Sequence, residues 1–178
     1  MKENIIFLLK DLPKIISLSR EKKIAKILIK KSLKIATAES CTGGLISSRL
    51  TDISGSSSYI IQNFVTYANE AKINLLGVNP DTINKYGVVS EEVALEMSKG
   101  LLKKYNCDIA LATTGIAGPM GATDTKPVGL ICISVVNNFS KKTICYKENP
   151  MLERRLMKYK FSNKALDLLL DFLNENYK

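Results

Sequence analysis

Short apolar runs alternate with segments of helical spacing along most of this chain, and this alternation constrains its fold more than any other feature. The apolar runs begin near residues 33, 60, 108 and 128, and the segments between them repeat apolar residues at three- and four-residue steps. Such alternation is typical of a sheet covered by helices. We therefore predict one α/β domain, and 178 residues are enough to bury a core.

The pattern also predicts where the individual elements lie. A serine that can cap a helix, Ser90, precedes two glutamates and an apolar repeat. We expect strands over residues 33–36, 60–67, 108–113, 128–136 and 142–147, and helices over residues 42–51, 69–76, 80–85, 90–105 and 152–176.

The first 30 residues are predicted to be helical, with Pro13 marking a break. We divide the chain into a helical extension over residues 1–21 and a main domain over residues 22–178. The extension could lie on a membrane surface as a basic amphipathic helix, or pack on the domain or a partner subunit, and we favour packing. No apolar run is long enough to cross a membrane, and the start lacks a signal-peptide cleavage site, so we expect a cytoplasmic protein.

The net charge of +9 raises the question of nucleic-acid binding. The excess lies at the ends, with +7 over residues 1–34 and +4 over residues 141–178, whereas residues 35–140 carry −2. Only four of the 26 basic residues are arginine, which indicates a general lysine-rich composition. This distribution argues against a nucleic-acid partner.

The chain contains four cysteines and no histidine. No Cys-x-x-Cys pair is present, so we predict neither a zinc site nor any other metal site. We expect Cys107, Cys132 and Cys145 to be small buried apolar residues of a reduced protein.

Residues 37–44, with the sequence TAESCTGG, join a predicted strand to a predicted helix. A capped helix start explains one hydroxyl and one glycine, but not all the polar and glycine residues together. Such a turn can present a nucleophilic serine beside backbone N–H groups, which makes Ser40 a candidate nucleophile. Cys41 is a rival nucleophile. Because histidine is absent, either would need a different base.

Residues 64–72, with the sequence FVTYANEAK, contain a candidate base. Most lysines are solvated, but a lysine desolvated in a cleft loses proton affinity and can act as a base near neutral pH. Lys72 lies three residues into a predicted helix, and Tyr67 lies at the preceding strand end, so both side chains could face one side.

A third segment, residues 112–122 with the sequence ATTGIAGPMGA, follows a predicted strand and precedes KPVG at residues 126–129. Its glycines permit close backbone approach to a ligand. It matches neither the phosphate-binding Walker pattern nor the dinucleotide fingerprint.

These three segments, together with GVVS at residues 87–90, resemble the CinA C-terminal family of nicotinamide-nucleotide amidases, also called PncC. The resemblance runs from about residue 22 to residue 170. It implies a single three-layer α/β/α domain with a mixed sheet, in the family's stand-alone form. It also implies hydrolysis of nicotinamide mononucleotide to nicotinate mononucleotide and ammonia, without metal or cofactor. The resemblance further implies a homodimer.

Carried onto this sequence, the resemblance implies Ser40 as nucleophile with Tyr67 and Lys72 as its partners. Substrate contacts are expected at Thr42, Gly43, Gly44, Thr114, Gly115, Ala117, Gly118 and Arg154. The chain departs from the family pattern at Ala122, where a glycine is usual, and at Lys158, where a second arginine is usual. A lysine offers phosphate only a point charge, so the departure at Lys158 concerns phosphate affinity more than chemistry.

Two other classes of function stay open on the sequence. The glycine turns would also serve a module that binds a phosphate-bearing ligand without turnover. The family name and the basic ends would fit a competence-associated accessory protein, whose binding to DNA would be salt-sensitive.

Overall fold

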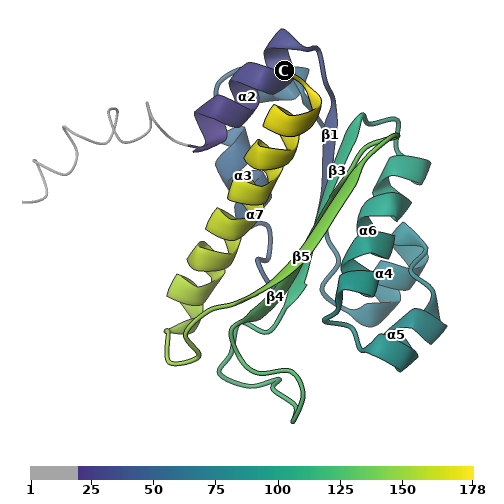
Figure 1. Ribbon diagram of the computed structural model, residues 1–178, viewed down its shortest axis with the longest axis vertical. Coiled ribbons are helices and arrows are strands. Elements are labelled where there is room, and N and C mark those ends of the chain that lie inside the picture. The colour runs from purple at the N-terminus through teal and green to yellow at the C-terminus, as the bar shows by residue number, and fades with distance from the viewer. Residues whose placement is uncertain (1–19) are drawn as a thin grey trace, which may run out of the picture.

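In the computed structural model, which describes residues 20–178, one five-stranded mixed sheet forms the centre of the domain (Figure 1). The strand order is β2-β1-β3-β4-β5. Strand β1 pairs in parallel with β2 and β3, whereas β3–β4 and β4–β5 are antiparallel. This confirms the predicted α/β class and its mixed sheet.

Most elements lie close to their predicted positions. The strands are β1 (Ile35–Glu39), β2 (Ile60–Val65), β3 (Ile109–Gly115), β4 (Leu130–Val136) and β5 (Lys141–Lys147). The helices are α2 (Arg20–Lys30), α3 (Leu45–Thr51), α4 (Asn69–Leu76), α5 (Pro80–Tyr86), α6 (Glu91–Lys104) and α7 (Arg154–Asn176), with a short 3-10 helix η1 (Ser56–Ser58).

Helices cover both faces of the sheet, which gives the three layers that were expected. Figure 1 shows α2, α3 and α7 on one face and α4, α5 and α6 on the other. Each face has its own apolar core. Ile133 and Phe161 are fully buried in the first core, and Ala110 and Met97 are fully buried in the second.

Strand β1 extends further than the sequence indicated, because the prediction ended it at residue 36 and it continues to Glu39. Its small and polar residues look like a loop in isolation, but β1 has paired neighbours on both sides and is buried along its whole length. Tertiary pairing therefore overrides the local preference. The next helix begins at Leu45, three residues later than predicted, because residues 41–44 form a turn.

The helix over residues 20–30 is confirmed, and it packs against α7. An ion pair between Glu21 and Arg49 joins α2 to α3, and Arg49 also donates to Ser162 Oγ of α7. The predicted extension over residues 1–21 lies almost wholly outside the described residues. Within residues 20–178, no helix is long and apolar enough to span a membrane.

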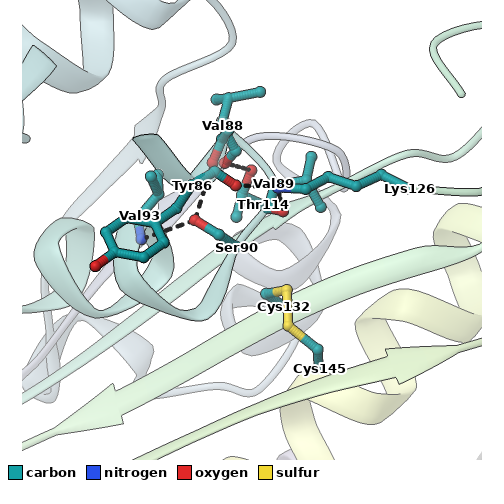
Figure 2. Close-up of a disulfide and its surroundings, with 10 residues drawn as sticks. Tyr86, Val88, Val89, Ser90, Val93, Thr114, Lys126, Cys132 and Cys145 are labelled. Carbon is teal, nitrogen blue, oxygen red and sulfur yellow. Dashed lines mark hydrogen bonds between the residues drawn. A yellow bond between two sulfur atoms is a disulfide. The ribbon is translucent and has the colours of Figure 1, made fainter. Parts of the chain in front are cut away.

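The expectation of uniformly reduced cysteines is wrong for two of them. Cys132 and Cys145 form a disulfide, which Figure 2 shows between neighbouring strands. They lie directly opposite each other in the β4–β5 pairing, with their Cα atoms 4.0 Å apart. The sequence could not show this, because it does not specify the register of the two strands. Cys107 is free and buried, as expected.

Candidate active site

The candidate site lies where the parallel strands β1 and β2 end side by side. Glu39, the last residue of β1, pairs with Val65 of β2, and the N–H of Thr66 donates to Glu39 O at 2.8 Å. The chain leaves β1 at Ser40 and leaves β2 at Thr66, so both turns begin at the same edge of the sheet. This explains how residues 32 positions apart in the chain can meet.

Ser40 and Lys72 are in hydrogen-bond contact. Lys72 Nζ lies 3.2 Å from Ser40 Oγ, and both side chains are buried, with exposed fractions of 1% for Lys72 and 9% for Ser40. The other neighbours of Lys72 Nζ are the carbonyl oxygens of Thr66, at 2.8 Å, and Tyr67, at 3.2 Å. A neutral amine has two N–H donors and one lone pair, so two carbonyls can accept its hydrogens while the lone pair accepts from a hydroxyl. An ammonium could donate to the same three oxygens, so these contacts accommodate both protonation states, and the burial of Lys72 decides between them.

The environment of Lys72 favours its neutral form. Burial lowers the pKa of Lys72 below its ordinary value, while the nearby Cys41 and Glu70 act weakly in the opposite direction. Among the ion pairs of residues 20–178, none involves Lys72. An ammonium without a carboxylate partner is costly to bury, so the proton is lost more readily.

A buried carboxylate shapes the turn that carries Ser40. Glu39 accepts from the N–H groups of Gly44, Ile46 and Ser47, at 3.1, 3.0 and 2.8 Å, and from Ser47 Oγ at 2.6 Å. These groups belong to the start of α3, where backbone N–H groups otherwise lack partners. The start of α3 is therefore occupied by a side chain of the protein itself.

Cys41, the rival nucleophile, is poorly placed for that role. Burial raises the pKa of its thiol to about 12, so the thiol is protonated at neutral pH. The nucleophilic form of cysteine is the thiolate. Its sulfur also packs close to the backbone, since a Cβ added at Gly115 would lie 2.9 Å from Cys41 Sγ. The described geometry therefore favours Ser40 over Cys41.

A cavity of about 480 Å³ opens above the Ser40–Lys72 pair. Its size suits a small organic ligand. The turn after β1, the start of α4, the segment before α6 and the loop after β3 each contribute a wall. The lining residues are Ser40, Cys41, Tyr67, Asn69, Lys72, Gly87, Val88, Val89, Thr114, Gly115, Ile116, Ala117, Met120, Gly121, Thr123, Lys126 and Arg154.

Tyr67 and Arg154 lie together in the lining of this cavity. Arg154 Nη2 donates to Tyr67 Oη at 3.0 Å, and Arg154 Nη1 donates to Gly118 O at 2.5 Å. The side chain of Tyr67 is exposed. The contact between Tyr67 and Lys72 is made by the backbone carbonyl of Tyr67, which accepts from Lys72 Nζ. Among the hydrogen bonds of the described residues, none joins the Tyr67 hydroxyl to Lys72 or Ser40.

Thr114, Gly115, Ala117 and Arg154 line this cavity as expected, but the other four expected substrate contacts do not. Gly118 meets the site only through its carbonyl, which accepts from Arg154. Thr42 is fully buried and shares a hydrogen bond of 3.1 Å with Thr113. Gly43 and Gly44 instead border a second hollow of about 690 Å³, on the side of α3 and α7, together with Lys158. The amine of Lys158 would lie 3.0 Å from a Cβ added at Gly43. Lys158 therefore lies on the other side of the turn from Arg154, although the two are one helical turn apart.

Other residues of the site were not singled out from the sequence. Asn69, Val88 and Val89 line the cavity, and so does Lys126 of the KPVG segment. The proximity of Asn69 to Lys72, and the recurrence of glycine-containing segments, were the available signals. Among residues 20–178, no group of three or more potential metal-ligating side chains is present.

These features define an α/β domain with a buried serine–lysine pair at the base of a cavity. The chain belongs to the CinA C-terminal domain family, whose sequence profile matches residues 17–173. It is 50% identical over 156 residues to a CinA-like protein of Chloroherpeton thalassium, and 44% identical over 158 residues to one of Chlorobium limicola. These alignments cover 86% and 87% of the chain but 37% of each relative, so the chain spans less than two fifths of their length.

Solved structures of proteins similar to this chain have the same fold. The competence/damage inducible protein CihA from Agrobacterium tumefaciens superposes with a TM-score of 0.81 at 36% identity, covering 87% of this chain and 95% of that one. The competence damage-inducible protein A from Klebsiella pneumoniae superposes with a TM-score of 0.84 at 30% identity, covering 89% and 97%. The predicted family is therefore confirmed.

Proposed function

We propose that this chain hydrolyses the carboxamide of nicotinamide mononucleotide, giving nicotinate mononucleotide and ammonia. The observation that carries the proposal is the contact of 3.2 Å between Lys72 Nζ and Ser40 Oγ at the base of the cavity. A serine activated by an adjacent base is an established design for amide hydrolysis, and lysine is a known substitute for histidine in that role. The choice of substrate follows from the resemblance to the amidase family.

The first half of the reaction forms an acyl-enzyme. Ser40 Oγ attacks the carboxamide carbon while neutral Lys72 takes the hydroxyl proton. The carbonyl oxygen becomes an oxyanion, and the N–H group of Cys41, which follows Ser40 in the chain and lines the cavity, is its proposed donor. Lys72 then gives its proton to the leaving nitrogen, the C–N bond breaks, and ammonia departs.

The second half restores the serine. A water molecule attacks the ester carbon and loses a proton to Lys72, and the bond to Ser40 Oγ breaks as that proton returns to the serine. This step gives the carboxylic acid of nicotinate mononucleotide, which loses its proton to solvent and is released as the carboxylate. The proton cycle is closed by Lys72 alone, so Tyr67 is free for a different role.

We assign Tyr67 and Arg154 to substrate binding. Arg154 lines the cavity and is held on Tyr67 Oη and Gly118 O, which orients its guanidinium. A guanidinium held in one orientation is well suited to a phosphate group. Replacing Tyr67 with Phe removes one of its acceptors, and we expect a rise in KM of about tenfold with kcat changed less than threefold. A large fall in kcat in Tyr67→Phe would instead place the phenol in the proton path.

The direct test is ammonia release from nicotinamide mononucleotide by the purified chain without added metal. We expect turnover by the native chain and a fall of at least about 10³-fold in Ser40→Ala, with unchanged circular dichroism. Cys41→Ser is the matched variant at the neighbouring position, and we expect it to keep most of the activity. Normal turnover by Ser40→Ala would overturn the assignment.

The same samples distinguish the other two classes of function. Calorimetric binding of nicotinamide mononucleotide by the native chain without ammonia release would indicate a ligand-binding module. A salt-sensitive shift of duplex DNA at physiological salt, without either result, would indicate an accessory role of the kind that the relatives' names suggest.

A further inference from the structure

The KPVG segment contains a lysine that holds two backbone carbonyls of a different segment. Lys126 Nζ donates to Tyr86 O and, at 2.5 Å, to Val89 O. Tyr86 is the last residue of α5, and Val89 lies between α5 and α6. Lys126 is half-buried, whereas residues 121–125 before it are exposed. An ammonium has three donors, so two of those of Lys126 are already engaged within the protein.

The two carbonyls between them are also held by side chains. Ser90 Oγ donates to Gly87 O at 2.9 Å, and Thr114 Oγ1 donates to Val88 O at 2.8 Å. Figure 2 shows Lys126, Thr114 and Ser90 gathered around this segment. All four consecutive carbonyl oxygens of residues 86–89 therefore accept a hydrogen bond from a side chain, which fixes the path of the chain from the end of α5 into the segment before α6.

Both segments that Lys126 joins are walls of the cavity. Val88 and Val89 line it from one side, and Met120 and Thr123 of the loop after β3 line it from another. Lys126 makes the side-chain hydrogen bonds that connect these two walls. Lys126 Nζ lies so close to the backbone here that a Cβ added at Gly87 would be 2.7 Å from it, so a side chain at Gly87 would displace the amine.

We propose that Lys126 is a positioning residue that clamps the loop over residues 116–129 to residues 86–89 and so sets the width of the substrate cavity. The identity of the ligand in this inference rests on the proposed function. The clamp itself rests on the hydrogen bonds of Lys126. Among the hydrogen bonds of the described residues, none joins Lys126 to Ser40 or Lys72. The clamp therefore acts on binding and leaves the chemical step to the serine–lysine pair.

Lys104 provides a matched control. Its Nζ also donates to two backbone carbonyls, Asn74 O at 3.3 Å and Leu75 O at 2.9 Å, and it does not line the cavity. Lys104→Met thus removes the same kind of interaction at a different place. Lys126→Arg keeps the charge and donors, and it serves as the conservative variant.

The first measurement needs no substrate. Hydrogen exchange followed by mass spectrometry compares Lys126→Met and Lys104→Met with the native chain. We expect amide exchange in residues 116–127 and 86–89 to accelerate at least about tenfold in Lys126→Met, and to be unchanged in Lys104→Met and largely restored in Lys126→Arg. Equal exchange in the native chain and Lys126→Met would overturn the clamp, whatever the protein's activity.

The second measurement uses a Ser40→Ala background, in which ligands bind without turnover. We expect Lys126→Met to weaken binding of nicotinamide mononucleotide and of nicotinamide riboside by a similar factor, about tenfold. In the Ser40 enzyme we expect the same factor in KM, with kcat changed less than threefold. A loss confined to the phosphorylated ligand would overturn the proposal, because Lys126 would then bind phosphate directly. If Ser40→Ala alone binds neither ligand, the proposed function fails, and the exchange result still decides the clamp.

Discussion

The two halves of the sheet use their polar residues differently. In the parallel half, β1 and β2 end at one edge, and the polar groups that follow them meet at Ser40 and Lys72. In the antiparallel half, buried hydroxyl groups contact one another inside the domain. Ser134 of β4 contacts Ser98 Oγ at 2.8 Å and Thr143 Oγ1 at 2.9 Å, and all three are at least partly buried.

The difference follows from strand direction. Parallel strands bring their carboxyl ends to the same edge, so polar groups there remain available to a ligand. In the antiparallel half, the hydroxyl of Ser134 is instead paired with those of Thr143 on the neighbouring strand and Ser98 on α6. We therefore expect changes at the edge of the parallel half to reduce activity, and changes in the antiparallel half to lower stability with little effect on activity.

The largest effect is expected at Lys72. Arginine stays protonated at any accessible pH, so Lys72→Arg should lower kcat/KM by about 10²- to 10⁴-fold. In the native chain, kcat/KM should rise with pH as Lys72 loses its proton, with a midpoint below the ordinary lysine value of about 10.4, since burial lowers this pKa. Activity is lost as the pH falls through that midpoint.

The measurement is a pH profile of ammonia release at low substrate concentration. Lys104→Arg is the control, because Lys104 also donates to two carbonyls and lies outside the cavity. A profile that stays flat from pH 6 to pH 10 would contradict a lysine base.

A smaller effect is expected at Glu39, whose carboxylate holds the start of α3. Hydrogen bonds to a charged group contribute about 1.5–3 kcal/mol. Glu39→Gln should therefore lower the free energy of unfolding and, by loosening the turn that carries Ser40, lower kcat by about tenfold. Urea denaturation and ammonia release measure the two effects.

Glu96 provides the control for this change. It also accepts from a backbone N–H, that of Asn79 at 2.8 Å, and from a hydroxyl, that of Thr82 at 2.6 Å. We expect Glu96→Gln to lower stability without changing kcat. Equal losses of activity in both variants would show that kcat follows general stability and not the turn.

The smallest effect on activity is expected at the Cys132–Cys145 disulfide, in the antiparallel half. Closing a loop with a sequence separation of 13 stabilises a protein by about 3 kcal/mol in the chain-entropy description. The double variant Cys132→Ala, Cys145→Ala should lose about that much stability and keep its activity within twofold. Thermal melts with and without reductant should differ for the native chain and coincide for the double variant, and a tenfold loss of activity would break the contrast between the two halves.

The sequence predicted most of the elements because their apolar patterns are local. The N-cap at Ser90 was visible as a serine before two glutamates, and its Oγ accepts from Val93 N in the structure. The length of β1 and the Cys132–Cys145 pairing were not predictable in this way, because both depend on strand neighbours that are distant in the chain.

The candidate site shows the same limit. The residue types at Ser40 and Lys72 suggested a nucleophile and a base, but their contact depends on the pairing of Glu39 with Val65. The hydrogen bonds from the start of α3 to the Glu39 carboxylate were not predicted, because the sequence does not show in which direction this side chain points. The displacement of Lys158 to the second hollow also required the position of α7.

Lys72 is buried at the bottom of the cavity, whereas Tyr67 is exposed, so solvent exposure increases from the serine–lysine pair towards the opening. Dissolved ions screen charges near water strongly and buried groups weakly. Added salt should therefore weaken the capture of an anionic substrate near Arg154 while leaving the proton exchange between Ser40 and Lys72 almost untouched. Ionic strength thus separates the recruitment of the substrate from its conversion without any change to the chain.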